Sequence, residues 1–276
     1  MTSARVAVIG GSGLYSLFDP AESELVTVTT PYGEVTVTIG ELGGRRTAFI
    51  TRHGSDHSVA PHLINYRANI WALASLGVTA ILSSSAVGGV SPDYPSGTLV
   101  LTDQYIDRTS GRPDTFYDRG SVQHLSSADP FCPQLLDVAR AALSAAGETI
   151  RPSGTVVVIQ GPRFSTRAES LWFRAAGAHT VNMTMYPEVP LAAELNIGTV
   201  NISYVTDADA GVDDAEKGGT EKGDEVSHEL VLRRLVEAQP RIVAAIETII
   251  RAMPEDYTPR ELIPAAEVAA VLARTA

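Results

Sequence analysis

Apolar residues along the chain gather in short unbroken runs, each the length of a buried β-strand rather than of a helix. Such runs occupy residues 5–9, 46–51, 78–82, 97–103, 155–159 and 197–205. Residues 26–39 differ, because valine alternates with threonine on both sides of Pro31-Tyr32-Gly33. That alternation predicts a β-hairpin with one face in water.

Other stretches have the apolar spacing of helices. We expect helices over residues 65–76, 135–146, 167–176, 189–195, 226–253 and 265–274. Glycines end the first two, at Gly77 and Gly147, and Pro240 predicts a break or kink in the fifth. Strands alternating with helices predict an α/β fold, with one domain over residues 1–276 built around a mixed, twisted sheet. The helical segment from about residue 226 to 276 belongs to that domain.

Three further segments are predicted to be loops. Residues 83–89, Ser-Ser-Ser-Ala-Val-Gly-Gly, are predicted to form a small-residue loop after a buried strand. Residues 104–133 are polar and contain prolines, and a structureless connection of this length indicates a functional role. Residues 209–225 are rich in Gly, Asp, Glu and Lys, which is typical of either a mobile lid or a solvated turn.

Composition narrows the classes of function. The 276 residues are 44% hydrophobic, enough for a substantial core, and the formal net charge of −11 opposes non-specific binding to nucleic acid or to an anionic membrane. No run approaches the roughly 20 apolar residues of a membrane span, and the N-terminus lacks signal-peptide features. The single cysteine, Cys132, suits a reducing compartment, so we expect a cytoplasmic protein.

Two carboxylates, Asp207 and Asp209, stand where the apolar run 197–205 ends. They could form an acid/base pair, bind a metal, or read a hydrogen-bonding ligand, and turn-forming residues would look the same. No histidine or cysteine lies nearby at ligand spacing, which disfavours a metal site. Two residues on one strand exit cannot flank a sugar from opposite sides, which disfavours a glycosidase.

Two stretches offer groups for an anion. Residues 5–9 lead into Gly10-Gly11-Ser12-Gly13, where backbone N–H groups and the Ser12 hydroxyl can approach one. A dinucleotide fingerprint would need a third glycine where Ser16 stands, so that interpretation is weak. Arg52 and His53 directly follow the run 46–51 and suit an oxyanion clamp, although a surface arginine beside a hydrogen-bonded histidine would look alike.

Read in order, the segments resemble the purine nucleoside phosphorylase superfamily, and most closely its methylthioadenosine phosphorylase branch, over about the whole chain. The matching segments are Ile9-Gly10-Gly11-Ser12-Gly13, Arg52-His53-Gly54, Asn65-Tyr66-Arg67-Ala68-Asn69-Ile70, Asp103-Gln104-Tyr105-Ile106-Asp107-Arg108-Thr109, Gly161-Pro162-Arg163-Phe164-Ser165, Asn182-Met183-Thr184, Pro187-Glu188 and Thr206-Asp207. The resemblance implies an α/β sandwich, a homotrimer, and phosphorolysis of an N-glycosidic bond. Inorganic phosphate would be a co-substrate, and no cofactor or metal is expected.

The resemblance also implies a role for particular residues. Those expected at phosphate are Ser12, Arg52, His53, Ser85, Ala86 and Thr184. Met183 would lie under the ribose and Phe164 against the base, with Ser165, Asp207 and Asp209 at the purine edge. His124 matches a position that reaches into the sugar pocket of a neighbouring subunit.

Asp207, Ser165 and His228 bear on catalysis and specificity. A protonated Asp207 could donate to N7 of the leaving purine, which requires a pKa raised by burial. The 6-oxopurine branch carries Asn and Glu where this chain has Asp207 and Ser165, so the present pair favours 6-aminopurines.

His228 stands where the methylthioadenosine branch tends to have an apolar residue and the 6-oxopurine branch has a histidine bound to the 5′-hydroxyl. Unless it is simply a helix-face histidine, it predicts that adenosine or 2′-deoxyadenosine is accepted beside S-methyl-5′-thioadenosine. The alternatives are a broader or 6-oxopurine phosphorylase, a nucleosidase, and a purine-binding protein without catalysis.

Overall fold

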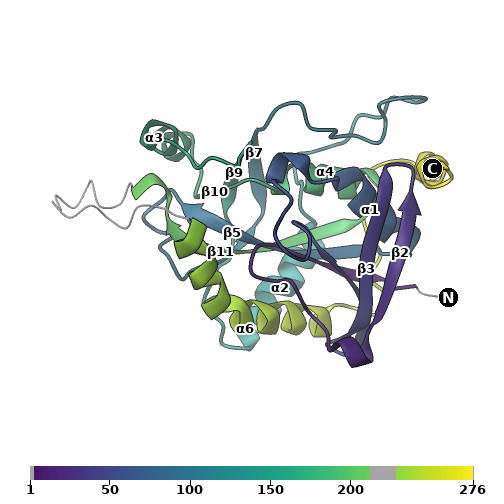
Figure 1. Ribbon diagram of the computed structural model, residues 1–276, viewed down its shortest axis with the longest axis horizontal. Helices are drawn as coiled ribbons and strands as arrows, with labels where there is room; N and C mark the ends of the chain where they lie inside the picture. The colour runs from purple at the N-terminus through teal and green to yellow at the C-terminus, as the bar shows by residue number, and fades with distance from the viewer. Residues whose placement is uncertain (1–2, 212–227, 276) are drawn as a thin grey trace.

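The structure is a computed structural model described over residues 3–211 and 228–275, and it is built around one mixed sheet with helices on both faces (Figure 1). The strands are β1 (Val6–Gly10), β2 (Glu24–Thr30), β3 (Gly33–Leu42), β4 (Arg45–Thr51), β5 (Ala80–Gly89), β6 (Leu99–Thr102), β7 (Gln104–Arg108), β8 (Ile150–Arg151), β9 (Thr155–Ile159), β10 (Thr180–Asn182) and β11 (Gly198–Ala208). The helices are α1 (Tyr66–Ser75), α2 (Pro133–Ala145), α3 (Arg167–Ala175), α4 (Met185–Glu194), α6 (His228–Ala252) and α7 (Ala265–Leu272). The expected α/β fold is therefore confirmed.

Strand β5 is the centre of the sheet. The order runs β2-β3-β4-β1-β5-β10-β9-β7, and β11 pairs with β5 and β6. The pairings β4–β1, β1–β5 and β5–β11 are all parallel, so the carboxyl ends of these four strands lie on the same side of the molecule. The β2–β3 hairpin predicted from the valine–threonine alternation is confirmed as an antiparallel pair at one end of the sheet.

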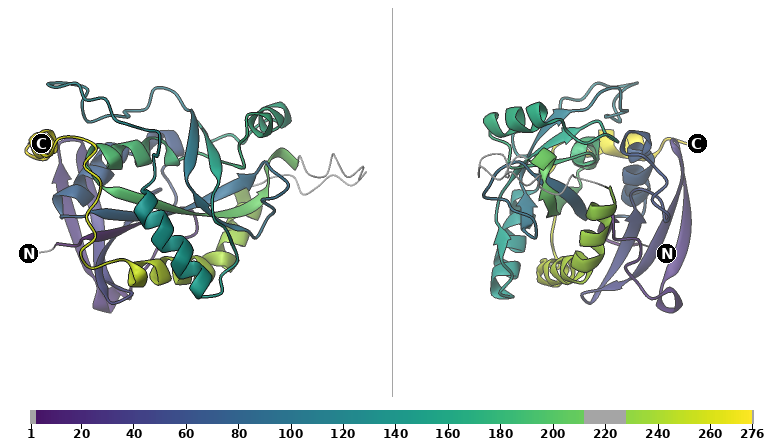
Figure 2. Two further views of the ribbon diagram at one scale, coloured as in Figure 1. Left: turned by 180° about the vertical axis from the view of Figure 1, so that it is seen from behind. Right: turned by 60° about the vertical axis from the view of Figure 1, so that its left-hand side comes forward.

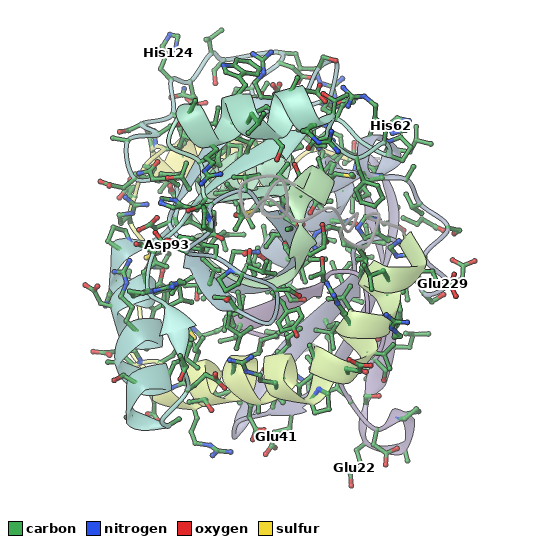
Figure 3. The ribbon with its side chains drawn as sticks, turned by 90° about the vertical axis from the view of Figure 1, so that its left-hand side faces the viewer. Glu22, Glu41, His62, Asp93, His124 and Glu229 are labelled. Atoms are coloured by element: carbon green, nitrogen blue, oxygen red, sulfur yellow. The ribbon has the colours of Figure 1, made fainter. Side chains whose placement is uncertain are left out.

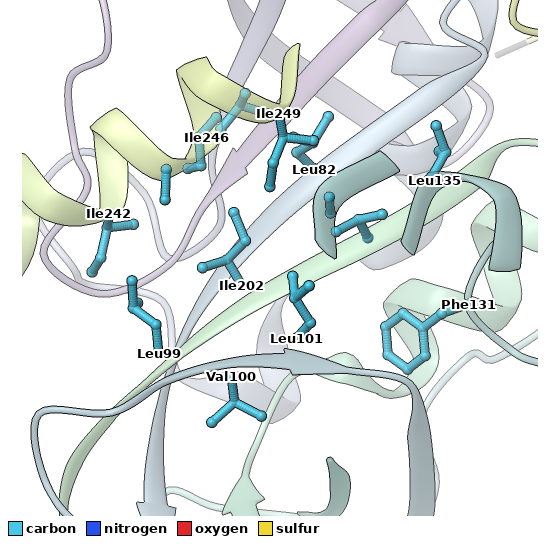
Figure 4. Packing of buried hydrophobic residues seen from close by; sticks show 14 of the residues in the cluster. Leu82, Leu99, Val100, Leu101, Phe131, Leu135, Ile202, Ile242, Ile246 and Ile249 are labelled. Atoms are coloured by element: carbon cyan, nitrogen blue, oxygen red, sulfur yellow. The ribbon is translucent and has the colours of Figure 1, made fainter. Parts of the chain in front are cut away.

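Side chains alternate between two apolar layers. In β1, Val6 and Val8 enter one core cluster, whereas Ala7 and Ile9 enter the other. Helices α2 and α6 pack against each other and cover the first layer, as the view from behind shows (Figure 2). Helices α1, α4 and α7 cover the second. Figure 4 shows α6 packing onto the sheet through Ile242, Ile246 and Ile249.

The prediction of a loop over residues 83–89 is wrong. Strand β5 continues through all of them, and β11 pairs with it from Ala80 to Gly89. Small polar residues disfavour strands only weakly, and here β11 pairs along the whole segment, while β1 pairs with Ser83 and β10 with Gly88 and Gly89 on the other edge.

The carboxylate stretch and the long polar segment also differ from expectation. Strand β11 does not end at Val205 but continues through Asp207 to Ala208, with a register shift between Val205 and Asp207. Residues 104–133 are not wholly structureless, because they begin with β7, which pairs with β9.

The C-terminal helical prediction holds with one difference. Helix α6 runs from His228 to Ala252 as one element, with Pro240 inside it rather than at a break. Of residues 209–225, for which a lid and a solvated turn were both open, only Asp209–Gly211 lies in the described part, as a short 3₁₀ turn. None of the helices in the described residues has the length and apolar character needed to cross a bilayer.

Candidate active site

A cavity of about 420 Å³ opens where β1 and β4 end beside β5, β10 and β11. This volume is in the range of small-molecule sites. The predicted site residues that line it are Ser12, Arg52, His53, Ser85, Ala86, Phe164, Met183, Thr184, Asp207 and Asp209. Groups far apart in the sequence are thus brought to one place.

Three predicted residues do not line this cavity. Ser165 lies beside it, next to Asp209. His124 is exposed and lies at the outer edge of the molecule (Figure 3). His228 is the first residue of α6, and its side chain is outside the described part, although Val231, three residues on, lines the cavity.

Arg52 is held in place by an ion pair. Its Nε and Nη2 donate to the two carboxylate oxygens of Glu188 at 2.6 and 2.7 Å, and its Nη1 donates to the carbonyl of Ser84 at 2.9 Å. Burial alone would lower the pKa of this guanidinium, but the Glu188 carboxylate raises it. These bonds use three of the five guanidinium N–H groups, so Arg52 can still donate to a ligand in the cavity.

The loop after β1 approaches Arg52 so closely that it needs a glycine. A Cβ at Gly11 would lie 2.5 Å from the Ser84 carbonyl oxygen and 2.9 Å from Arg52 Nη1. The Gly11 N–H donates to Ser84 Oγ at 3.1 Å, which ties the loop to β5. Ser12 is thereby presented at the cavity wall.

His53 is a neutral group at pH 7. Burial, with a smaller contribution from the neighbouring Arg52, lowers the pKa of its imidazole to about 4. Its Nδ1 lies 2.9 Å from the carbonyl oxygen of Val59, which can only accept, so the proton is on Nδ1. The Nε2 of neutral His53 carries no proton and is therefore an acceptor. It can accept a hydrogen bond from an oxyanion that carries a hydroxyl group.

Asp207 is a buried carboxyl on strand β11. Its side chain is next to Gly88 of β5, where a Cβ would lie 3.4 Å from Asp207 Oδ2, and the Thr206 hydroxyl donates to its Oδ1 at 2.6 Å. Burial raises the pKa of this carboxyl above its usual value, while the Thr206 hydroxyl and Arg234 oppose the shift. Burial thus moves Asp207 in the direction that the acid interpretation requires.

Asp209 is the second buried carboxyl at this end of the cavity. Burial, with a smaller contribution from the adjacent Asp207, raises its pKa to about 6. The Ser165 hydroxyl is close enough to oppose it, yet neither Ser165 Oγ nor Asp209 Oδ2 has a partner in hydrogen-bonding geometry among the described residues. Buried polar atoms of this kind suit a ligand with both donors and acceptors.

The two ends of the cavity are separated along β5. Ser85 pairs with Ser203 and Gly88 pairs with Asp207. Three residues along β5 therefore separate Ser85, at the end of the cavity that suits an anion, from Gly88 beside the Asp207 carboxyl. At about 3.3 Å per residue this distance is about 10 Å.

The structure adds three residues that sequence reasoning gave no role. Glu188 forms the ion pair that holds Arg52. Asn182 lines the cavity, and its Nδ2 has no partner among the described residues. Arg112 connects the segment after β9 to the segment around Met183 and Tyr186. Arg112 donates to the carbonyls of Met183 and Tyr186 at 3.0 and 2.5 Å and to that of Gln160 at 2.9 Å.

The sequence held only partial signals for these residues. Glu188 and Asn182 belong to segments that carry the family resemblance, and Arg112 lies in the long polar segment, but nothing local identified their partners.

Comparisons with known proteins agree on one family. A family model described as the phosphorylase superfamily matches residues 5–251. An S-methyl-5′-thioadenosine phosphorylase of Thermofilum pendens is 45% identical over 261 residues, covering 93% of this chain and 95% of the relative. A purine nucleoside phosphorylase of Streptomyces coelicolor is 44% identical over 263 residues, covering 91% and 90%.

Solved structures give the same result. The methylthioadenosine phosphorylase of Schistosoma mansoni, in complex with adenine, superposes with a TM-score of 0.82 at 30% identity, and the match covers 98% of each chain.

Proposed function

The chain belongs to the phosphorylase superfamily, and from this premise we propose that it cleaves purine nucleosides with inorganic phosphate. The substrate is S-methyl-5′-thioadenosine, with adenosine or 2′-deoxyadenosine accepted beside it, and the products are adenine and the (methylthio)ribose 1-phosphate. The observation that carries the proposal is one cavity lined by Ser12, Arg52, His53 and Ser85 at one end, which suit an anion, and by two buried carboxyls at the other.

The two ends suit the charges that develop in this reaction. As the bond between ribose C1′ and purine N9 breaks, positive charge grows on the ribose and negative charge on the base. A phosphate oxygen, held by Ser12, Arg52, His53, Ser85 and Thr184 with Ala86 beside it, attacks C1′. Asp207 donates its proton to N7, so that the electron pair of the broken bond leaves on a neutral base.

The carboxyl end favours a 6-aminopurine. A carboxyl oxygen accepts from an exocyclic amine, whereas a 6-oxopurine presents a carbonyl there, which needs a donor. In this proposal Asp209 and Ser165 share the purine edge with Asp207, Phe164 packs on the base and Met183 lies under the ribose. His228 at the start of α6 would meet the 5′ substituent.

A second candidate is a broader or 6-oxopurine phosphorylase. It is supported by the Streptomyces coelicolor relative, which is named a purine nucleoside phosphorylase and is as similar as the methylthioadenosine enzymes.

We further propose a homotrimer of single-domain chains, in the cytoplasm, that needs no cofactor beyond phosphate as co-substrate and serves purine and methionine salvage.

A substrate panel tests the proposal. S-methyl-5′-thioadenosine, adenosine, 2′-deoxyadenosine, inosine and guanosine are each incubated with and without phosphate, and the free base and the sugar phosphate are quantified. We expect adenine release that requires phosphate and yields stoichiometric sugar 1-phosphate, and slower release of hypoxanthine and guanine.

Each alternative has its own outcome. Base release without phosphate would identify a nucleosidase, and faster cleavage of inosine would favour the 6-oxopurine alternative. If the protein bound a purine nucleoside but released no base, it would be a purine-binding protein without catalysis.

A further inference from the structure

A row of small polar side chains crosses the sheet beneath the anion end of the cavity. Thr102 on β6, Asn201 and Ser203 on β11, and Ser83 and Ser85 on β5 are all buried, and the first three are fully so. Adjacent residues on the same strands, Leu101, Ile202 and Leu82, point into the core under α6 (Figure 4). Because side chains alternate along a strand, the polar row lies on the opposite face.

The orientation of the Asn201 amide defines the donors and acceptors in this row, and the bond lengths agree with it. Ser203 Oγ and Asn201 Oδ1 are 2.7 Å apart, the usual length of an O–H···O bond. Asn201 Nδ2 is 2.9 Å from Ser83 Oγ and 3.0 Å from Ser85 Oγ, the usual lengths of N–H···O bonds. The amide therefore turns its NH₂ group toward the two serines and its oxygen toward Ser203.

Counting hydrogens then gives the direction of every bond. Ser203 has one hydroxyl proton and gives it to Asn201, so in the 3.1 Å contact between Thr102 Oγ1 and Ser203 Oγ the threonine is the donor. Asn201 gives its two amide protons to Ser83 and Ser85. All the bonds point the same way, from Thr102 through Ser203 and Asn201 to the serines of β5.

The last member of this chain lines the cavity. Ser85 Oγ accepts from Asn201, and within the described residues no acceptor for the Ser85 hydroxyl proton is found. With one lone pair taken by Asn201, the proton of Ser85 is directed away from the amide. Ser83 is bonded in the same way but does not line the cavity.

We propose that Asn201 is a positioning residue, which by donating to Ser85 Oγ turns the Ser85 hydroxyl proton toward the phosphate oxygen bound in the cavity. This inference rests on the proposed function, because it needs phosphate at Ser85. Asn201 touches neither phosphate nor nucleoside and acts through Ser85 alone.

The test is Asn201→Asp, a substitution of nearly the same shape. Because the new carboxyl is buried, the phosphate KM is measured at alkaline pH, where this carboxyl is ionised. The carboxylate accepts where the amide donated, so both serine hydroxyls turn toward residue 201 and Ser85 no longer donates to phosphate. A hydrogen bond to a charged group is worth roughly 10- to 100-fold in an equilibrium constant, so the phosphate KM rises by about that factor. The nucleoside KM and kcat at saturating phosphate change little.

A double-mutant cycle with Ser85→Ala separates this effect from the added negative charge. If Asn201 acts through Ser85, then Asn201→Asp raises the phosphate KM no further once Ser85 is alanine. Repulsion of phosphate by the new carboxylate would instead persist in the Ser85→Ala background and would overturn the proposal.

Two more variants complete the design. Ser83→Ala removes the other acceptor of Asn201 and leaves the phosphate KM near that of the wild type, with any loss confined to thermal stability. Asn201→Leu removes the donor without adding charge, so it serves if Asn201→Asp does not fold, and it also raises the phosphate KM selectively.

An unchanged phosphate KM in either folded Asn201 variant overturns the proposal. So does an equal rise in the phosphate and nucleoside KM values. Wild-type cleavage without phosphate would instead refute the proposed function, and the wild-type control in the same assay shows this separately.

Discussion

Asp207 combines two properties that rarely occur together in a carboxyl group: burial, with a raised pKa, and an open cavity in front of it. A raised pKa favours the protonated form of Asp207, and in the proposed reaction this form gives its proton to the leaving purine. Exposed aspartates elsewhere in the chain lack the burial that makes this possible.

Replacing Asp207 with Ala removes that proton donor and is expected to lower kcat for adenosine by about 100-fold. Steady-state release of adenine at saturating phosphate measures the effect. Asp207→Asn is the matched variant, because it keeps the shape and loses the titrating proton; we expect it to lower adenosine turnover and to raise the ratio of inosine to adenosine cleavage. Near-normal adenosine turnover in Asp207→Ala would exclude the acid role.

Asp209 gives a prediction about stability and pH. Its pKa is about 6 in the folded protein against 3.8 for an unperturbed aspartate, so folding disfavours the ionised form. The contribution of Asp209 to the free energy of unfolding is therefore fully present below pH 4 and is lost as pH rises through 6. Asp209→Asn is therefore expected to stabilise the protein relative to the wild type at pH 7.5, by at most about 2–3 kcal/mol, and by much less at pH 4.5.

Urea denaturation in phosphate-free buffer at the two pH values measures this difference. Asp256→Asn, at an exposed aspartate, is the control and should show no comparable pH dependence. An equal stability difference at both pH values would contradict the assignment of the raised pKa to Asp209.

At the scale of elements, most strands and helices could be predicted from the sequence. The prediction was wrong where the composition of a segment favours a loop but neighbouring strands pair with it. Local patterns were enough for three strands. The alternation in residues 26–39 corresponds to β2 and β3, and the apolar run 155–159 corresponds to β9. The serine- and glycine-rich residues 83–89 have a loop-like composition, and only the flanking strands make them part of β5. Tertiary pairing decided that segment, and no local pattern reports it.

The same limit applies to the candidate site. Ser12, Arg52 and His53 could be chosen locally, because small or cationic residues after a buried strand suit an anion. Arg112 could not, because its acceptors are carbonyls at Gln160, Met183 and Tyr186, more than forty positions away. Residues that hold other residues in place are recognised by their tertiary contacts, and a single sequence does not show those contacts.

At the scale of the whole molecule, His124 is a predicted site residue that lies outside the cavity of its own chain. It is exposed at the outer edge of the molecule (Figure 3). In the proposed homotrimer this position serves the sugar pocket of a neighbouring subunit, so each site would draw on two chains.

Subunit mixing tests this arrangement. We expect light scattering to give the mass of three chains, and His124→Ala to raise the nucleoside KM. When His124→Ala and Asp207→Ala chains are mixed under conditions of subunit exchange, some sites regain both an intact Asp207 and a neighbour's intact His124. Activity above the mean of the two variants is the expected result, and activity equal to that mean would place His124 outside the neighbour's site.

The ion pair between Arg52 and Glu188 has a consequence for electrostatic balance. The chain as a whole carries a net charge of −11, and the guanidinium in the cavity is already matched by a carboxylate. Long-range electrostatics therefore does not draw phosphate in, because the net negative charge opposes its approach, and added salt screens that repulsion. In the proposed reaction, a phosphate bound beside Arg52 would keep much of its charge uncompensated until the ribose becomes cationic. The attraction between phosphate and ribose would then be strongest at the transition state, where it lowers the barrier.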